Sequence, residues 1–296
     1  MADKVVVITG ASSGIGEAVA LLLAKRSYRL VLASRNMAAL RMVAARCESL
    51  GAKVVVIKTD VSKTSGIQKL TETALHHFGN IDVWINNASI IFYSRFLDMQ
   101  PDEFRKILDT NLYSAVEGSR AALTQFEHQG HGTLINISSS LGAVPAPYAS
   151  SYVTSKFAVR GLSASLAQEL ALDDERDIHV CTVLPGTINT PVYQHSGNRM
   201  QHKVRAMPPV YSVEKAARKI AQLIEHPKQE IVIGKIVRPL NILYALMPRS
   251  FVRLFARYVR RYGLMDEANR AHDGNLYEPV ADGAISGGWR KERHAI

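Results

Sequence analysis

The alternation of two kinds of segment along the chain constrains the fold more than any other feature. Short apolar runs rich in β-branched residues alternate with helical patterns of roughly 10 to 20 residues, which is the signature of βαβ units and a parallel sheet. We therefore predict an α/β fold with a doubly wound, seven-stranded parallel sheet flanked by helices. The expected strands are Val5 to Thr9, Arg29 to Ala33, Lys53 to Lys58, Val83 to Asn86, Gly132 to Ile137, His179 to Leu184 and Glu230 to Gly234. The expected helices are Glu17 to Arg26, Met37 to Leu50, Thr64 to Phe78, Asp102 to Phe126, Ser151 to Leu172 and Val213 to Glu225.

Length and composition fit one α/β unit with a C-terminal extension. The chain has 296 residues, of which 47% are hydrophobic and 21% are charged, close to the average of globular proteins. The only cysteines are Cys47 and Cys181, so a disulfide framework is excluded. The opening stretch MADKVVVITG enters a strand pattern at once, without a basic region, a long apolar stretch or a cleavage site. We therefore expect a cytoplasmic protein.

The positive charge of the chain is concentrated in one segment. Subtracting its seven basic residues from the net charge of +10 leaves about +3 for the rest of the chain. The body is therefore nearly neutral, which argues against nucleic acid as a partner. The segment contains no acidic residue, and its basic residues are Lys235, Arg238, Arg249, Arg253, Arg257, Arg260 and Arg261.

A glycine-rich turn follows the first expected strand. The stretch VVVITGASSGIGEAVA places Gly10, Gly14 and Gly16 between a buried strand and a helix. Residues without a Cβ let the chain turn tightly, let a pyrophosphate approach closely and direct helix N-terminal N–H groups at that anion. The spacing departs from the GxGxxG fingerprint of dinucleotide-binding folds, but strand, turn and helix occur in the required order. The turn therefore predicts a Rossmann-like dinucleotide site.

The end of the second expected strand bears on the choice between NAD and NADP. An acidic residue at this place would bind the ribose 2′-hydroxyl of NAD, whereas this chain has Ser34 and Arg35 in VLASRN. A guanidinium can form a bidentate pair with a 2′-phosphate. We therefore predict that NADP(H) is the preferred cofactor and NAD(H) the alternative. The competing interpretation is that Arg35 simply faces solvent.

Four further motifs join the glycine turn. They are INNAS (Ile85 to Ser89), DTNLYSA (Asp109 to Ala115), INISSSLG (Ile135 to Gly142) and YVTSK (Tyr152 to Lys156). In this order and at these separations, the five motifs resemble the short-chain dehydrogenase/reductase family over residues 4–235. The resemblance implies a dinucleotide-binding catalytic domain at 1–235, followed by an amphipathic helical extension and tail at 236–296. One departure is Ser89, because the family more often has glycine there.

The resemblance also implies roles for the residues that match the family motifs. Tyr152 resembles the catalytic acid/base, Lys156 its activator and Ser139 the hydroxyl that orients the substrate carbonyl. Asn111 resembles the residue that supports a proton relay. For the serines on either side of Ser139 we prefer a turn or cap role. No metal ligand is expected, and the expected cofactor contacts are Gly10, Ser12, Ser13, Gly14, Ile15, Gly16, Ser34, Arg35, Asp60, Val61, Asn87, Ala88, Tyr152, Lys156, Pro185, Gly186, Thr187 and Thr190.

The chemistry explains why a phenol and an ammonium would lie one helical turn apart. Reduction of a ketone by hydride creates an alkoxide, which needs a proton as its charge develops. A free tyrosine with a pKa of about 10 holds its proton too tightly to act reversibly near neutral pH. We expect the ammonium of Lys156 to lower the pKa of Tyr152. The alternative function is that of a catalytically silent, NADP-binding regulatory or interaction protein with the same fold.

The expected substrate pocket is apolar. Its walls would come from Ile90 to Phe96, from Leu141 to Tyr148 and from a long connection, Ile188 to Pro209, that leaves the end of a strand. The first two stretches are mainly apolar or aromatic, which favours a small lipophilic alcohol or carbonyl compound as the substrate. We therefore predict an NADP(H)-dependent oxidoreductase that interconverts a lipophilic secondary alcohol and its ketone or aldehyde.

The C-terminal extension contains an amphipathic helix. In MPRSFVRLFARYVRRYG the apolar residues share one helical face and the arginines occupy the other. Such a helix could dock on its own body, join a dimer or contact a membrane peripherally through residues 236–262. No apolar run reaches about 18 residues, so a spanning helix is not expected. The final segment, Asp266 to Ile296, is expected to be flexible or to wrap over a neighbouring subunit, and the family resemblance implies a homodimer or homotetramer.

Overall fold

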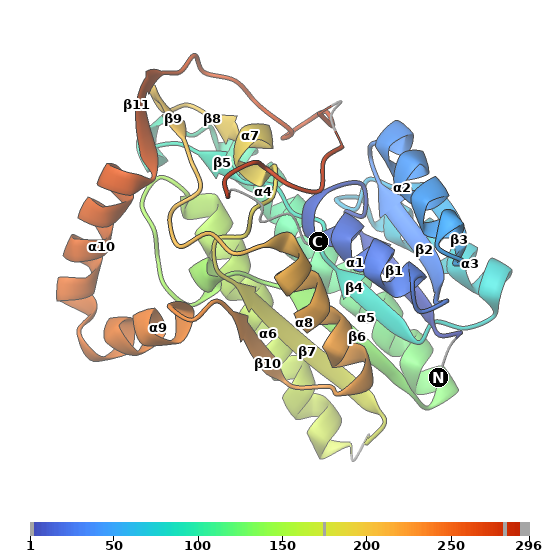
Figure 1. The fold of residues 1–296 in the computed structure, drawn as a ribbon. Coiled ribbons are helices and arrows are strands. Elements are labelled where there is room, and N and C mark those ends of the chain that lie inside the picture. The colour runs from blue at the N-terminus through green and yellow to red at the C-terminus, as the bar shows by residue number, and fades with distance from the viewer. Residues whose placement is uncertain (1–2, 174–175, 281–282, 291–296) are drawn as a thin grey trace.

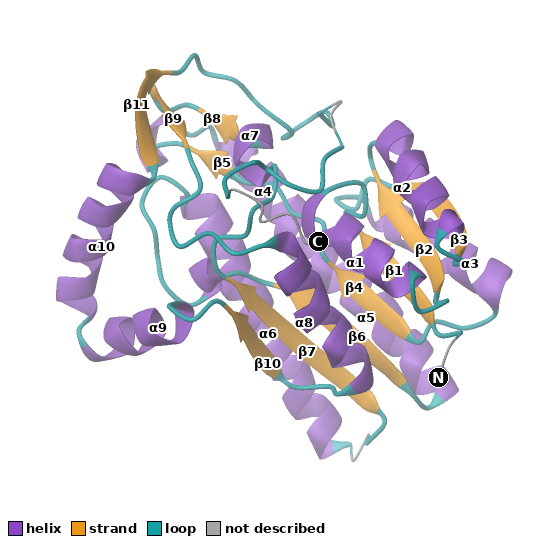
Figure 2. Ribbon diagram, viewed as in Figure 1, coloured by secondary structure: helices purple, strands orange, loops and turns teal. Residues whose placement is uncertain are grey.

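A parallel sheet organises the chain, which the computed structural model describes at residues 3–173, 176–280 and 283–290. Its strands lie in the order β10-β7-β6-β4-β1-β2-β3, as Figures 1 and 2 show. The predicted doubly wound α/β fold is thereby confirmed, and each strand end lies within one residue of the expected position. The strands are β1 (Val5–Thr9), β2 (Arg29–Ser34), β3 (Lys53–Lys58), β4 (Val83–Asn86), β6 (Gly132–Ile137), β7 (Ile178–Pro185) and β10 (Glu230–Ile233).

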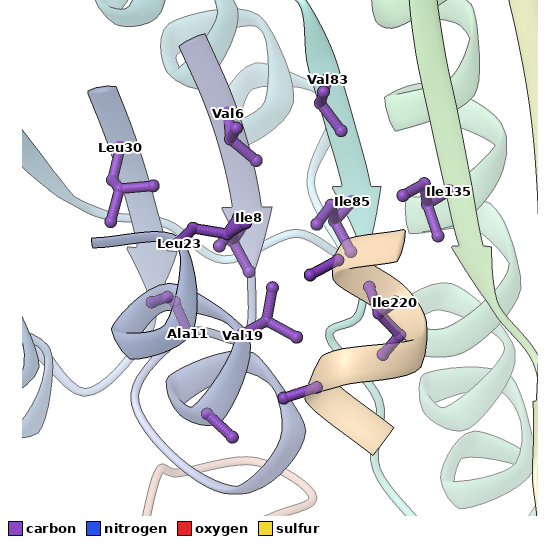
Figure 3. Close-up of a cluster of buried hydrophobic side chains, with 14 of the residues drawn as sticks. Val6, Ile8, Ala11, Val19, Leu23, Leu30, Val83, Ile85, Ile135 and Ile220 are labelled. Carbon is purple, nitrogen blue, oxygen red and sulfur yellow. The ribbon is translucent and has the colours of Figure 1, made fainter. Parts of the chain in front are cut away.

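Helices cover both faces of the sheet. Side chains of a strand point alternately to the two faces, so both faces of these apolar strands can be buried. Val6 and Ile8 of β1 meet the first set of helices, where Figure 3 shows Ile8 near Val19, whereas Val5 and Val7 meet the second set. The first set is α1 (Gly14–Ala24), α2 (Met37–Ser49) and α8 (Val213–Glu225), and the second set is α3 (Thr64–Phe78), α5 (Ser114–Gln129) and α6 (Ser150–Leu172).

The single helix expected from Asp102 to Phe126 is interrupted in the structure. A π-helical turn, η2 (Asp109–Tyr113), separates α4 (Pro101–Leu108) from α5. The apolar periodicity of this region did not reveal the turn, because one wider turn shifts the pattern only slightly. Such turns occur often at functional sites, and this one carries Asn111.

The connection from Ile188 to Pro209 and the C-terminal extension form a second layer above the carboxyl edge of the sheet (Figure 1). Within that layer β5 pairs with β8, and β9 pairs with β11. The predicted amphipathic helix corresponds to α10. The helix that precedes it, α9, was not predicted from the sequence. The elements of the layer are β5 (Phe92–Tyr93), η1 (Phe96–Asp98), η3 (Ser140–Gly142), α7 (Val192–His195), β8 (Gly197–Asn198), β9 (His202–Val204), α9 (Val237–Leu246), α10 (Pro248–Tyr262) and β11 (Leu264–Ala268).

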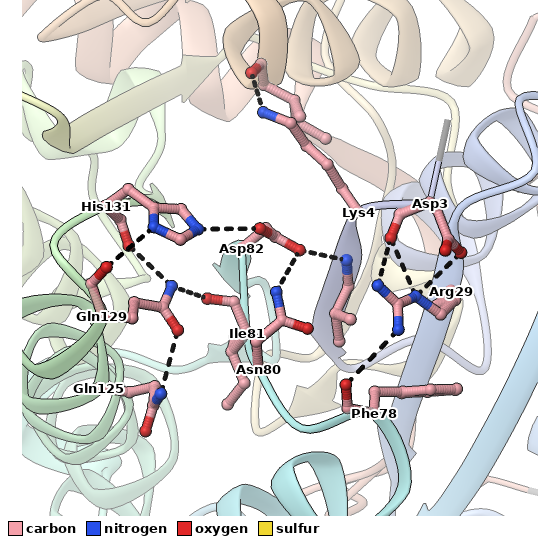
Figure 4. A network of polar contacts seen from close by, with 12 residues as sticks. Asp3, Lys4, Arg29, Phe78, Asn80, Ile81, Asp82, Gln125, Gln129 and His131 are labelled. Atoms are coloured by element: carbon pink, nitrogen blue, oxygen red, sulfur yellow. Dashed lines mark hydrogen bonds and ion pairs between the residues drawn. The ribbon is translucent and has the colours of Figure 1, made fainter. Parts of the chain in front are cut away.

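Polar contacts hold the opposite, amino-terminal edge of the sheet together. The carboxylate of Asp82 accepts hydrogen bonds from the Val5 N–H at 2.7 Å and from Asn80 Nδ2 at 3.0 Å, as Figure 4 shows with His131 on its other side. Arg29, the first residue of β2, donates to the carbonyl oxygen of Asp3 at 2.7 Å. These contacts provide hydrogen-bond partners for residues at the amino-terminal ends of the strands. In open α/β sheets ligands bind at the opposite, carboxyl edge.

We predict opposite effects of alanine at two helical glycines. A Cβ at Gly118 of α5 would lie 2.2 Å from Asn86 Oδ1, which already accepts from Trp84 Nε1, whereas a Cβ at Gly161 of α6 would meet nothing within 4 Å. Gly118→Ala should lower the free energy of unfolding by about 1–3 kcal/mol through overpacking. Gly161→Ala should raise it by up to about 1 kcal/mol. Urea denaturation measures both, and equal effects would contradict the close packing of α5 on β4.

Candidate active site

One cavity of about 640 Å³ lies at the carboxyl edge of the sheet. Every residue predicted to be catalytic or to contact the cofactor lines it, apart from Gly16 and Asn111. The predicted positions come from different loops and helices, and they meet because the carboxyl ends of parallel strands share one edge of the sheet. The lining residues that were predicted are Gly10, Ser12, Ser13, Gly14, Ile15, Ser34, Arg35, Asp60, Val61, Asn87, Ala88, Ser139, Tyr152, Lys156, Pro185, Gly186, Thr187 and Thr190.

The glycine turn is packed too closely for side chains. Gly10 has a φ of +65°, and a Cβ there would lie 2.8 Å from the Cα of Ala88. A Cβ on Gly16 would lie 2.3 Å from the carbonyl oxygen of Gly10. Asn87 supports the turn from behind, because its Nδ2 donates to the carbonyl oxygens of Thr9 at 2.9 Å and Gly10 at 3.1 Å. Gly16 therefore shapes the turn without lining the cavity.

The cavity presents polar groups that the protein itself does not satisfy. The N–H group of Ile15, in the first turn of α1, makes no hydrogen bond to a described residue. The buried side-chain oxygens of Ser89, Thr110 and Asn275 also have no partner, and all three residues line the cavity. Unpaired buried polar groups are costly, so they indicate a polar ligand. These groups and the close-packed turn fit a dinucleotide.

Arg35 at the end of β2 does not face solvent. Its Nη2 donates to the carbonyl oxygen of Asn275 at 2.6 Å, and its Nη1 donates to those of Tyr277 at 3.0 Å and Leu276 at 3.4 Å. Burial lowers the pKa of this guanidinium, with nearby Asp60 acting in the opposite direction. The described residues of the final segment therefore pack on their own chain, which corrects the expectation of a flexible tail.

Two hydrogen bonds join α6 to the end of β6. Lys156 Nζ donates to the carbonyl oxygen of Ile137 at 2.9 Å, and Ser138 Oγ donates to the carbonyl oxygen of Lys156 at 2.8 Å. Ser138 therefore does more than cap a turn, which corrects the expectation from sequence. Ser139 Oγ accepts from the Leu141 N–H at 3.1 Å and caps η3. Lys156 Nζ lies 5.5 Å from the centre of the Tyr152 ring.

Burial has the largest effect on the pKa values of Tyr152 and Lys156, the predicted catalytic pair. It raises the pKa of Tyr152, while a hydrogen bond with Ser139 acts in the opposite direction. It lowers the pKa of Lys156 to about 7. In the protein chain alone, burial therefore outweighs the expected lowering of the tyrosine pKa by the ammonium. Because the folded pKa of Lys156 lies below its usual value, the ammonium form predominates only below about pH 7.

Asn111 lies behind the wall of the cavity. Its Oδ1 accepts from the Ile90 N–H at 2.8 Å, and its Nδ2 donates to the Ile90 carbonyl at 2.8 Å and to Ser155 Oγ at 3.1 Å. The asparagine of the π turn thus connects the loop after β4 to α6. In this structure it positions the wall and does not line the cavity, whereas its buried neighbour Thr110 does.

Sequence reasoning missed two walls of the cavity. One comes from α9 and α10, and the other from the segment after Gly274. The aromatic face of the amphipathic helix was the only signal for the first wall, and it could not show where the helix docks. The residues concerned are Ile236, Val237, Leu240, Leu243, Phe251, Leu254, Phe255 and Tyr258 in the first wall, and Asn275, Pro279, Val280 and Gly283 in the second.

Comparisons with known proteins agree with this geometry. Residues 4–201 match the family model of the short chain dehydrogenases. The oxidoreductase YxnA of Bacillus subtilis is 31% identical over 98% of this chain and 83% of its own. An alcohol dehydrogenase from the archaeon Thermococcus sibiricus, complexed with 5-hydroxy-NADP, has 26% identity and a TM-score of 0.68 over 79% of this chain and 97% of its own. A Burkholderia phymatum short-chain dehydrogenase/reductase in complex with NAD shares the fold, with 22% identity and a TM-score of 0.75 over 86% of this chain and 96% of its own. The chain therefore belongs to the short-chain dehydrogenase/reductase family of oxidoreductases.

Proposed function

We propose that this oxidoreductase uses NADP(H) to interconvert a lipophilic secondary alcohol and its ketone or aldehyde. The observation that carries the proposal is that one cavity holds Ser139, Tyr152 and Lys156 and also reaches the glycine turn and Arg35. A bound nicotinamide would supply or accept the hydride. The protein residues would then hold the substrate oxygen and move its proton.

Each catalytic side chain has a distinct task in this proposal. In reduction the Tyr152 hydroxyl donates a proton to the oxygen on which charge develops, and Ser139 donates a hydrogen bond to the same oxygen. In oxidation Tyr152 accepts the alcohol proton. The Lys156 cation, with a pKa of about 7, stabilises the phenolate left by proton donation and holds the nicotinamide ribose. Lys156 is held for this task by its hydrogen bond to Ile137.

The adenosine end of the cavity supports a preference for NADP(H). Strand β2 ends at Ser34 and is followed by Arg35, so neither position carries the carboxylate that would repel a 2′-phosphate. Arg35 lines the cavity and offers a guanidinium, the side chain best suited to bidentate phosphate binding. The similar alcohol dehydrogenase of Thermococcus sibiricus is complexed with an NADP derivative, which adds support.

The substrate end of the cavity supports a lipophilic substrate. Leu240, Leu243, Phe251, Leu254 and Phe255 of the α9 and α10 hairpin line it with apolar and aromatic side chains. Such walls contribute binding energy through burial of apolar surface and offer no partner for a charged substrate group.

We predict that Tyr152→Phe removes turnover and keeps cofactor binding. The variant retains the ring but cannot transfer a proton, so kcat should fall by about 10²–10⁴-fold. The Kd of NADPH, measured by fluorescence titration, should stay within about twofold, because the phenol makes at most one weak contact with the cofactor. Turnover is followed by NADPH absorbance on a panel of lipophilic ketones and aldehydes.

Tyr211→Phe is the matched control, because Tyr211 is only partly buried and does not line the cavity. It should turn over like the unmodified protein. Retained kcat in Tyr152→Phe would contradict the proposed acid. NADPH binding by the unmodified protein without turnover of any substrate in the panel would favour the silent regulatory protein.

The corner between α9 and α10 points to a further partner. It projects away from the sheet in Figure 1, and the side chains of Ile242, Leu246, Met247 and Val252 are 48–75% exposed there. None of the four lines the cavity. We call these four residues the hairpin tip. Exposed apolar side chains clustered in this way indicate an interaction surface.

We infer that the hairpin tip contacts the surface of an anionic lipid bilayer. All seven basic residues between Lys235 and Arg261 are exposed, and none forms an ion pair with a residue that the structure describes. Anionic lipid complements this charge, whereas a second copy would bring like charges together.

Leu243 and Leu254 line the cavity and are also 39% and 58% exposed, so the cavity opens beside the tip. No helix in the described part of the chain is long and apolar enough to cross a bilayer, so we infer peripheral contact.

We predict that the protein co-sediments with vesicles containing phosphatidylserine and not with vesicles of phosphatidylcholine alone. The double variant Ile242→Ser with Leu246→Ser should reduce the bound fraction about tenfold or more, since two exposed apolar side chains lose their burial in lipid. Leu172→Ser is the matched control, because Leu172 is 86% exposed at the end of α6. Equal binding by both variants, or a tip variant that only breaks a dimer on size-exclusion chromatography, would contradict the inference.

A further inference from the structure

The C-terminal segment lies across the dinucleotide end of the cavity. We call its described residues, 275–280 and 283–289, the strap. Three of its carbonyl oxygens accept hydrogen bonds from Arg35. In addition, the Val280 carbonyl accepts from Asn36 Nδ2 at 2.9 Å, and the Ala284 carbonyl accepts from the Gly14 N–H at 3.0 Å. Its far end is held by Asn189, whose Oδ1 accepts from the Trp289 N–H at 2.8 Å. The strap is therefore bonded to the groups that surround the predicted phosphate site.

The strap forms a wall of the cavity and does not fill it. Asp60 and Val61, at the predicted adenine site, line the same cavity as Pro279 and Val280 of the strap. The strap and the predicted adenine site therefore bound the same cavity. The unpartnered Oδ1 of Asn275 also belongs to this wall, and a hydroxyl or amino group of a nucleoside could donate to it.

The strap holds Arg35 without using all its donors. A guanidinium has five N–H donors in a rigid plane. The carbonyls of Asn275, Leu276 and Tyr277 engage Nη1 and Nη2, and Nε makes no hydrogen bond to a described residue. A free arginine loses rotamer entropy when it binds phosphate, whereas an arginine already held in place loses less. Neutral carbonyls can orient the guanidinium without neutralising it, and the nearby carboxylates of Asp60 and Glu278 also act on its charge.

Leu276 fixes the part of the strap that contacts Arg35. Its side chain is 1% exposed and packs in a small apolar cluster with Phe92, Met99 and Ile107. The carbonyls on either side of Leu276 are therefore anchored by its burial. Because Leu276 does not line the cavity, its substitution changes the strap without removing a contact with the ligand.

We propose that the strap is a component of the dinucleotide site and that it positions Arg35 for the 2′-phosphate of NADP(H). The inference rests on the proposed NADP(H) function. It assigns cofactor discrimination to two separate parts of the chain, the end of β2 and the C-terminal strap. In this account Arg35 makes the phosphate contact, and Leu276 is a positioning residue that acts through it.

A double-mutant cycle of Arg35→Ala and Leu276→Ala tests the coupling, with the Kd values of NADPH and NADH measured by fluorescence titration. Leu276→Ala should weaken NADPH binding about tenfold, as expected for loss of a preorganised charge-assisted contact, and change NADH binding less than about twofold. In the Arg35→Ala background the same substitution should change NADPH binding less than about twofold. Ile107→Ala is the matched control from the same cluster, and it should leave the ratio of the two Kd values unchanged.

The outcomes separate this inference from the proposed function. If Arg35→Ala leaves the ratio of NADPH to NADH binding unchanged, the NADP(H) preference fails and the inference fails with it. If Arg35→Ala lowers that ratio but Leu276→Ala leaves NADPH binding unchanged or tightens it, only the role of the strap is overturned. If Leu276→Ala fails to fold, truncation after Gly274 serves instead, because it removes all three carbonyls that hold Arg35. Its effect on NADPH binding is then read in the same way.

Discussion

The hydrogen bonds between the end of β6 and helix α6 hold the proposed catalytic residues at one cavity. Ser138 Oγ donates to the Lys156 carbonyl, and Lys156 Nζ donates back to the Ile137 carbonyl. This reciprocal pair fixes the rotation of α6 above the sheet, so that Tyr152 faces the cavity beside Ser139. In the proposed reaction the glycine turn, Arg35 and the apolar walls act on the same ligand, because all of them line the cavity that Tyr152 faces.

Local sequence patterns predicted the parts of the fold that depend on local physics. Apolar β-branched runs located the strands, and the sheet edge then followed because parallel strands share their carboxyl ends. That Ser139, Tyr152 and Lys156 line one cavity could be predicted, because Tyr152 and Lys156 are one helical turn apart and Ser139 follows a strand. The π turn at Asn111 could not, because its five residues continue an ordinary helical pattern. That turn explains why Asn111 braces Ile90 and α6 from behind the cavity.

Contacts between distant segments escaped prediction for two physical reasons. The strap binds Arg35 through main-chain carbonyls, which every residue type possesses, so no side-chain pattern marks the site. The amphipathic pattern of α10 predicted a helix with an apolar face but not the cavity beneath that face. Ionisation was also context-dependent: the sequence suggested that a cation would acidify Tyr152, whereas burial of both groups has the larger effect on their pKa values.

The central claim is that the reactive end of a dinucleotide lies beside Tyr152 and Lys156. A crystal structure of the protein with NADP⁺ bound tests it most directly, through the position of nicotinamide C4. The account predicts that C4 lies in the cavity next to the Tyr152 hydroxyl, with Lys156 Nζ hydrogen-bonded to the adjoining ribose. A nicotinamide ring outside this cavity, or one separated from Tyr152 by protein, would contradict it.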